Sequence, residues 1–340
     1  SGSAVRDAGG HVAEGVAADR PSGDDAARPQ VARPSTRGVH VNSENINFGF
    51  LGGVLDGSTE DIYYHLGVGS SDPILDALAD VRAVILAGSA DRIREFASHW
   101  SELNGSSEIV VFPKDDRFTT HYTAGVLFVS HGMGMPSASI ALQELMRMVF
   151  FLKRGDVAEM DKVFWCRVGT SGGVGLPAGT VVVSTEALMA DLQPYRVLNG
   201  GNGAHWFDCR FPASTCDAII TANANVPELS VVSGKTVASK EFVLEQFRLD
   251  GAVCLASPEE KMNWLQWLDE NGVRNIEMEG AMMAGYLNHW GFSRFAMICC
   301  TIINRLEGDQ LTATPDELRK FSEDSGVAMF NYLKRDLLGS

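Results

Sequence analysis

The segment Trp165–Gly175 constrains this chain more than any other. It starts in an apolar run, Val163–Cys166, that predicts a strand entering a core. Next come one arginine, Arg167, two hydroxyl side chains and four glycines. The arginine needs an anion or carboxylate partner, because an unpaired buried charge is costly. Glycines let backbone N–H groups approach a ligand. The segment therefore predicts an anion pocket at the carboxyl end of a strand, where α/β sheets place ligands.

Composition argues against several classes of partner. The chain of 340 residues has a formal net charge of −15, which disfavours nucleic acid or an anionic membrane as its main partner. No apolar run reaches the ~18–20 residues that a membrane-spanning helix needs. The six cysteines form no C-x-x-C pair, so we expect reduced core cysteines and a cytoplasmic protein. The eight histidines show no metal-ligand spacing.

The chain divides into two regions by composition. Residues 1–45 have few large apolar residues and no signal-peptide core, which predicts a disordered extension. Residues 46–340 alternate between strand and helix patterns, which predicts one α/β domain with a mostly parallel or mixed sheet. Strands are expected at 81–87, 108–112, 126–130, 163–166, 180–184, 275–278 and 295–303. Helices are expected near 92–100, 137–153, 216–224, 258–271, 280–290 and 315–338.

A second feature suited to an anion is the turn Gly88–Arg92. It joins an expected strand to an expected helix and places Arg92 in the first helical turn. Free N–H groups and the helix dipole make such a turn suitable for phosphate. No P-loop and no G-x-G-x-x-G after a strand is present. Taken alone, Gly88–Arg92 also fits a solvated helix start. Arg117, which precedes the expected strand 126–130, would on its own be interpreted as a surface residue.

Two further pairs of polar residues suit a sugar and a base. Glu277 and Glu279 stand two residues apart at an expected strand end, where a carboxylate could accept hydrogen bonds from the vicinal hydroxyls of a sugar. A helix-capping pair is the alternative. Gln246 and Arg248 are also two residues apart. A carboxamide and a guanidinium on one side could form hydrogen bonds with the polar groups of an imide. Together these features suit phosphate, ribose and a pyrimidine.

Five segments, taken together and in their order along the chain, resemble the uridine phosphorylases of the nucleoside phosphorylase superfamily, and the animal ones most closely. The resemblance runs from about Asp61 to Lys334. It implies a three-layer α/β/α sandwich with a central mixed, partly barrel-like sheet. The segments that carry it are Ser130–Gly134, Arg167–Gly173, Arg248–Gly251, Arg274–Glu279 and Asn304–Gln310.

The resemblance also implies a role for each matching residue. The implied phosphate-binding residues are Gly88, Arg92, Arg167, Thr170 and, from the neighbouring subunit, Arg117. The implied ribose-binding residues are Thr170, Met278, Glu279 and, from the neighbouring subunit, His65. The implied uracil-binding residues are Phe242, Gln246, Arg248, Ile302 and Ile303. Of these, Arg92, Arg167, Arg248 and Glu279 are the implied catalytic residues.

The implied activity is that of a pentosyltransferase in pyrimidine salvage. Uridine, and deoxyuridine as well, reacts reversibly with inorganic phosphate to give uracil and the pentose 1-phosphate. Phosphate is a co-substrate, and no cofactor is expected. Because His65 and Arg117 would serve a neighbour's pocket, a homodimer is the smallest active unit. Asp116 and Ser137 are the nearest candidates for a cation at the subunit interface, which some relatives hold.

Three alternatives remain open at this point. A purine nucleoside phosphorylase usually has an aspartate after its last core strand, whereas Thr301–Arg305 contains none. A nucleosidase would use water and would not need the arginines. An inactive relative would act as a binding or assembly subunit. The sequence departs from its relatives at Phe247, where a smaller or polar residue is usual, and at Gly280. Neither departure removes a catalytic group.

Overall fold

The centre of the fold is a nine-stranded mixed sheet. The computed structural model describes residues 48–106, 108–112 and 118–339, so the expectation for residues 1–45 lies outside the described residues. The strands, in spatial order, are β12 (Val273–Glu277), β11 (Ser230–Ala238), β8 (Thr180–Leu188), β13 (Phe295–Asn304), β7 (Phe164–Gly173), β3 (Ala83–Ala87), β6 (Val126–Ser130), β5 (Thr120–Thr123) and β4 (Val110–Phe112).

Part of this sheet closes into a barrel. β12 pairs in parallel with β11 and also pairs antiparallel with β7, through Asn275 opposite Gly173 and Ile276 opposite Gly172. The strands β12, β11, β8, β13 and β7 therefore form a ring, and β3, β6, β5 and β4 continue from β7 as an open sheet. The predicted mixed, partly barrel-like sheet is confirmed.

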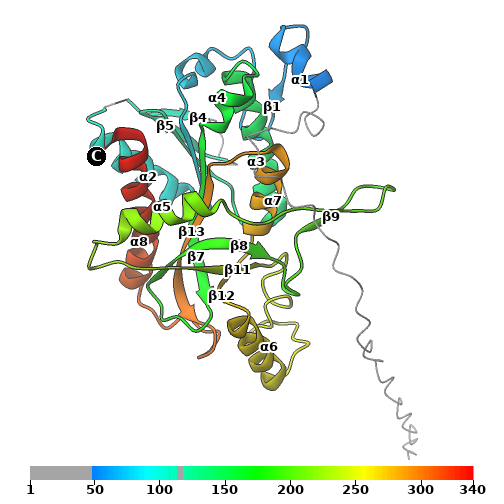
Figure 1. Ribbon diagram of the computed structural model, residues 1–340, viewed down its shortest axis with the longest axis vertical. Helices are drawn as coiled ribbons and strands as arrows, with labels where there is room; N and C mark the ends of the chain where they lie inside the picture. The colour runs from blue at the N-terminus through cyan, green and yellow to red at the C-terminus, as the bar shows by residue number, and fades with distance from the viewer. Residues whose placement is uncertain (1–47, 107, 113–117, 340) are drawn as a thin grey trace, which may run out of the picture. The chain divides into compact units, whose positions relative to one another are not determined.

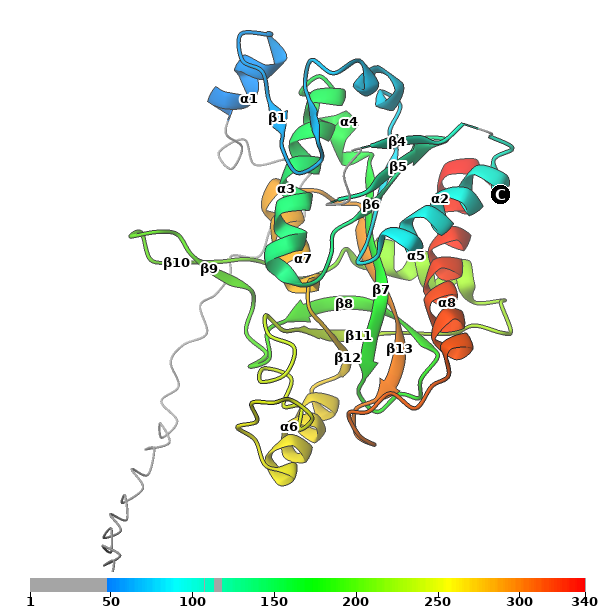
Figure 2. The ribbon, with the colours of Figure 1, turned by 180° about the vertical axis from the view of Figure 1, so that it is seen from behind.

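Helices cover both faces of the sheet. In Figures 1 and 2, α2, α5 and α8 lie on one side and α3 and α7 on the other, while α6 lies near the end of β12. Their bounds are α2 (Ala90–Leu103), α3 (Gly134–Leu152), α5 (Ala213–Asn223), α6 (Pro258–Glu270), α7 (Gly280–Trp290) and α8 (Pro315–Leu333). None of the helices in the described part of the chain is long and apolar enough to cross a bilayer.

The sequence determines several of these helices locally. α6 and α8 each begin with a capping box followed by proline: Ser257 with Glu260, and Thr314 with Glu317. α2 buries Ile93, which lies on the same face as Ala97 and Trp100. The buried faces of the helices and the apolar strands form one main core.

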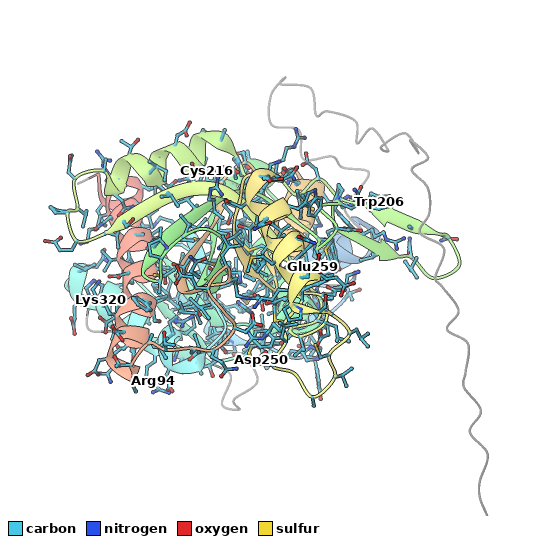
Figure 3. All side chains as sticks on the ribbon, turned by 90° about the horizontal axis from the view of Figure 1, so that it is seen from below. Arg94, Trp206, Cys216, Asp250, Glu259 and Lys320 are labelled. Carbon is cyan, nitrogen blue, oxygen red and sulfur yellow. The ribbon has the colours of Figure 1, made fainter. Side chains whose placement is uncertain are left out.

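The remaining elements are short. They are α1 (Phe48–Leu55), β1 (Ile62–Tyr63), β2 (Val68–Gly69), the 3₁₀ turn η2 (Pro73–Leu78), α4 (Val157–Asp161), β9 (Arg196–Leu198), β10 (Ala204–Trp206) and η3 (Lys334–Leu338). β9 and β10 form an antiparallel hairpin that extends away from the barrel, with Trp206 on it (Figures 1 and 3). The Arg196 guanidinium lies over the Trp206 ring at 5.4 Å.

The opening segment differs from the expectation in one respect. The strand does not end near Cys166; β7 continues to Gly173, and the glycines are paired residues of the strand. This holds for Gly169, Gly172 and Gly173, whereas Gly175 lies beyond the strand. Two of them make room for neighbouring side chains: a Cβ at Gly169 would lie 3.0 Å from the Arg167 guanidinium, and one at Gly172 would lie 3.0 Å from Cγ of Arg305. The glycines thus give two buried arginines space beside the strand.

Candidate active site

A cavity of about 380 Å³ lies where β3, β6, β7 and β13 approach their carboxyl ends. Because these strands are parallel to their neighbours in this part of the sheet, the residues after them gather at one edge. The cavity collects most of the residues that the sequence singled out. Those that line it are Gly88, Arg92, Arg167, Thr170, Phe242, Gln246, Arg248, Met278, Glu279, Ile302 and Ile303.

The part of the cavity that the sequence predicts to bind phosphate, called the phosphate end below, is built from two turns in close contact. Gly88 follows β3, and Gly132 follows β6 with a φ of +70°. A Cβ on Gly88 would lie 2.9 Å from the Gly132 carbonyl oxygen, so only glycine fits at position 88 without moving the backbone. Ser89 caps α2 by accepting a hydrogen bond from the Arg92 backbone N–H. The start of α2 therefore faces the cavity with its positive dipole end.

Arg92 extends from the first turn of α2 toward this cavity. Its Nε donates to Ser322 Oγ of α8 at 2.6 Å, which fixes the guanidinium. Burial and then the nearby charge of Arg167 lower the pKa of Arg92. Two guanidinium groups that face one cavity repel each other, and an anion bound between them would relieve the repulsion.

Arg167 is buried inside β7 and has its carboxylate partners within the chain. It pairs with Glu279, and its Nη1 lies 3.2 Å from Glu277 Oε2 and donates to Cys299 Sγ at 2.9 Å. Burial alone would lower the pKa of Arg167, but Glu279 and the other acidic neighbours raise it. The charge that the sequence identified as needing a partner is thus balanced by two glutamates.

The sequence left open whether the two glutamates cap a helix or accept hydrogen bonds from a ligand, and in the structure their positions differ. Glu277 ends β12 and accepts hydrogen bonds from the backbone N–H groups of Glu279 and Gly280, both at 2.9 Å. It therefore caps α7, and burial raises its pKa. Burial would also raise the pKa of Glu279, but the charge of Arg167 outweighs burial and holds the pKa of Glu279 below its usual range. Glu279 lines the cavity as an ionised acceptor.

Gln246, another residue of the cavity lining, is held from two sides. Its Nε2 donates to Ser239 Oγ at 2.7 Å. The guanidinium of Arg305 donates to the Gln246 backbone carbonyl at 2.7 Å and to its Oε1 at 3.3 Å. Arg305 is 1% exposed and is paired with Asp309 at 2.9 Å. Gln246 is therefore fixed in orientation before any ligand contacts it.

Arg248 is fixed in a similar way. Its guanidinium pairs with Asp250 through two hydrogen bonds of 2.9 and 2.6 Å, and Nη2 also donates to the Asp309 carbonyl at 3.0 Å. It lies over the Phe242 ring at 4.5 Å. Asp250 belongs to the loop before α6, the helix that carries Glu259 (Figure 3). The arrangement places a cation, an amide and an aromatic ring around one part of the cavity.

The two departures from the family pattern leave this lining intact. Phe247 adopts a φ of +50° and stacks on Trp264 of α6, with ring centroids 5.2 Å apart. It does not line the cavity. At Gly280 a Cβ would lie 2.5 Å from Cε of Met297 and 3.0 Å from Oε1 of Glu277. Glycine here lets α7 begin directly beside the capping carboxylate.

Some predicted residues do not lie at the cavity of their own chain. His65 does not line it, and its Nδ1 lies 2.7 Å from Glu144 Oε1. Arg117 and Asp116 lie outside the described residues. Ser137, on α3, donates from its Oγ to the His131 carbonyl at 2.6 Å. Within residues 48–106, 108–112 and 118–339, no group of three histidine, cysteine or acidic side chains is placed to hold a metal.

Sequence reasoning gave no role to three charged or titratable residues of the cavity. Arg305 directly follows an apolar strand, and the argument that identified Arg167 would have identified it too. Asp309 anchors Arg305 and also accepts from the Leu249 backbone N–H at 3.0 Å. His131 lies in Ser130–Gly134, one of the segments that carry the resemblance, but the sequence assigned it no role. Its burial became evident only in three dimensions.

The family is established by comparison with known proteins. Residues 82–335 match the model of the phosphorylase superfamily. The chain belongs to this superfamily, as the fold and the cavity indicate.

Within it, the chain is similar to animal uridine phosphorylases. Uridine phosphorylase A of Schistosoma mansoni is 35% identical over 82% of this chain and 93% of that protein. Inactive uridine phosphorylase B of the same organism is 32% identical over the same shares. The crystal structure of the S. mansoni uridine phosphorylase in complex with thymine superposes with a TM-score of 0.77 at 34% identity, covering 84% of this chain and 98% of that one. These relatives place the chain in the uridine phosphorylase family.

Proposed function

We propose that this protein catalyses the reversible phosphorolysis of uridine, and of deoxyuridine, to uracil and the pentose 1-phosphate. The observation that carries the proposal is that two distinct clusters of charged and polar groups line one cavity. Arg92, Arg167 and Glu279 form one cluster of the lining, and Gln246 and Arg248 form a second cluster, joined through Arg305 and Asp309. The first cluster suits phosphate and ribose, and the second suits a base, which are the parts that meet in the reacting complex.

The chemistry follows from where charge develops. Breaking the glycosidic bond makes the ribose cationic and leaves negative charge on uracil. Phosphate held near Arg92 and Arg167 stabilises the cation and then forms the new bond to C1′, while the departing electron pair goes to uracil. Arg248 and Gln246 stabilise that leaving group at its carbonyl oxygens. Such catalysis works by electrostatics and positioning and needs no strong acid.

The ionised carboxylate of Glu279 suits the ribose. A carboxylate accepts hydrogen bonds and donates none, so it orients hydroxyl groups. Its negative charge also favours the cationic sugar of the transition state. Inorganic phosphate is the co-substrate in this scheme, and no organic cofactor takes part.

The base end favours a pyrimidine imide. Arg248 donates only, whereas the Gln246 amide can both donate and accept, which matches the carbonyl and N–H groups of uracil. Ile302, Ile303 and the Phe242 ring supply apolar walls for a flat ring. The solved relative binds thymine, which supports a pyrimidine site.

The proposed active unit is a homodimer in which His65 and Arg117 complete the neighbour's cavity. The position of His65 away from its own chain's cavity supports this arrangement. The proposed setting is pyrimidine salvage in the cytoplasm. Five of the six cysteines are buried as free thiols, and the cytosol keeps thiols reduced.

An assay with a panel of nucleosides tests the proposal. Uridine, deoxyuridine, thymidine and inosine are incubated with and without phosphate, and base release is measured. We expect release from uridine and deoxyuridine at rates that rise with phosphate and saturate, and none from inosine. Preferred use of inosine would establish a purine enzyme, and phosphate-independent release would establish a nucleosidase.

A third outcome would identify an inactive protein. One relative with a similar percentage identity to this chain is named inactive, so the proposed catalytic activity needs a direct test. Uracil binding without turnover of any nucleoside would make this chain a binding or assembly subunit. The retained Arg92, Arg167, Gln246, Arg248 and Glu279 argue for turnover.

A further inference from the structure

The proposed reaction leaves one buried titratable residue of the cavity unused. His131 lies between β6 and α3 and is 1% exposed. Its backbone N–H donates to the Ala87 carbonyl at 2.8 Å, and its own carbonyl accepts from Ser137 Oγ at 2.6 Å. The main chain of His131 is therefore fixed between the two turns of the phosphate end.

His131 lines the ligand cavity, and its imidazole has no hydrogen-bond partner among the described residues. It lines the cavity together with Gly88, Arg92 and Arg167. Both ring nitrogens are buried, and neither has a hydrogen-bond partner among the described residues. Arg167 Nε is a further buried donor in the same cluster that lacks one. Native proteins rarely leave buried polar groups unsatisfied, so such a cluster at a cavity indicates a ligand.

His131 is neutral at physiological pH. Burial lowers its pKa to about 4; the neighbouring Glu279 opposes this shift, whereas Arg167 and Arg92 add to it. A neutral imidazole has one N–H donor and one acceptor nitrogen. It can therefore donate a hydrogen bond without adding charge to a site that already holds two guanidinium groups.

We propose that His131 is a further phosphate-binding residue, whose neutral ring N–H donates to an oxygen of the bound phosphate. This inference rests on the proposed function, which supplies phosphate as the ligand. Glu279, Arg167 and Arg92 are charged groups near the ring, and the two arginines together with the adjoining glycine turns favour phosphate over sugar. Gly88 lies against Gly132, the residue after His131, and the His131 backbone N–H donates to Ala87, the residue before Gly88. A phosphate dianion accepts hydrogen bonds, as a neutral ring N–H requires.

Direct measurement of phosphate binding tests the assignment. The dissociation constant of inorganic phosphate is measured by calorimetry for the wild-type protein, His131→Leu and His131→Gln. We expect His131→Leu to weaken phosphate binding by roughly 10- to 100-fold, as for a lost hydrogen bond to a charged group. His131→Gln, which keeps an N–H donor, should recover most of that loss. KM for uridine should stay within about 2-fold, since the ring does not touch the sugar in this assignment.

A matched control uses another histidine outside the cavity. His289 of α7 is half-buried and packs against Phe207, with ring centroids 5.6 Å apart. His289→Leu should leave the phosphate dissociation constant unchanged. A raised KM for uridine with unchanged phosphate binding in His131→Leu would assign the ring to ribose and overturn the proposal. Unchanged values for both ligands would also overturn it.

Two further points keep the test decisive. If His131→Leu does not fold, nitrogen-15 NMR of wild-type histidine rings replaces it: one His131 ring N–H resonance should shift as phosphate is added, and no shift contradicts the proposal. The calorimetry does not depend on turnover. A wild-type protein that binds phosphate through His131 but leaves uridine intact overturns the proposed function and supports this inference.

Discussion

At the scale of single residues, the site is a set of fixed charges that counterbalance one another. Arg167 is paired with Glu277 and Glu279, and Arg248 is paired with Asp250. Each guanidinium is thereby held in place before substrate arrives, so little reorganisation is needed when charge develops. Because several of these contacts use two nitrogens of one guanidinium, lysine is a poor substitute for either arginine.

Removal of Arg248 should reduce turnover. In the proposed mechanism its guanidinium stabilises the charge that develops on uracil, and losing one preorganised donor costs about 10²–10³-fold in rate. We expect Arg248→Ala to lower kcat for uridine by that factor, with Arg248→Lys recovering little. Arg196→Ala is a matched control, because Arg196 also lies over an aromatic ring but sits on the exposed β9–β10 hairpin. Near-normal kcat in Arg248→Ala would remove Arg248 from the mechanism.

The buried neutral His131 should make stability depend on pH. Its folded pKa of about 4 lies below the unfolded value near 6.5, so the unfolded chain binds the proton more readily. The contribution of this group is complete above pH 6.5 and is lost as the pH falls toward 4. The full loss is about 3 kcal/mol at 1.36 kcal/mol per pH unit. Burial raises the pKa of Glu277, which acts in the opposite direction.

Comparison with His131→Gln isolates the histidine. Denaturant unfolding at pH 7.5, 6, 5 and 4.5 gives the free energy of unfolding for both proteins. We expect the wild type to lose more stability than His131→Gln between pH 6.5 and 4.5, because glutamine does not titrate. Parallel curves for the two proteins would show that His131 is not neutral in the folded state.

At the scale of elements, local patterns predicted some parts well and others poorly. The helices α6 and α8 begin with their own capping boxes, so their starts could be read from sequence. β11 was missed because Ser230–Ala238 mixes polar and apolar residues, and it forms a strand through pairing with β8 and β12. The length of β7 was missed for a related reason. Its glycines predict a loop locally, but pairing on both sides and two neighbouring arginines require them within the strand.

The candidate site, too, was predicted from sequence only in part. Residues of the right chemistry at strand ends could be found from sequence, and their identity as a uridine site depended on the family resemblance. Arg305 and Asp309 support Gln246 from 59 or more residues away in the sequence, and no local spacing indicates that contact. The ion pairing of Arg167 with Glu279 spans 112 residues and likewise required the fold.

A substitution at the contact between two turns tests how the phosphate end is built. Gly88→Ala would place a Cβ 2.9 Å from the Gly132 carbonyl, so one turn must move by a few tenths of an ångström or more. We expect KM for phosphate to rise by about 10-fold or more, since small displacements of positioning groups are costly, while uracil binding stays close to normal. Gly201→Ala is the control, because a Cβ there meets no atom within 4 Å. Unchanged phosphate kinetics in Gly88→Ala would show that the turns move freely.

At the scale of the whole molecule, the proposed dimer makes each cavity a product of two chains. Gln246, Arg248 and Glu279 come from the chain that owns the cavity, whereas His65 and Arg117 are assigned to the neighbour. A mixed dimer of two inactive variants then contains one complete cavity if their substitutions lie on opposite sides of the subunit boundary. This follows because a twofold interface gives each chain both roles at once.

Co-expression of Arg117→Ala and Arg248→Ala tests this sharing. Each variant alone should retain about 1% of wild-type kcat or less. Equal amounts that mix at random give mixed dimers in half of all cases, and one of the two sites in each mixed dimer is intact. Recovery to about a quarter of wild-type activity is therefore expected. The control pairs Arg248→Ala with Glu279→Gln, two residues of the same chain's cavity; every site then keeps a defect, and no recovery follows. Equal recovery in both mixtures, or in neither, would mean that Arg117 does not complete a neighbour's site.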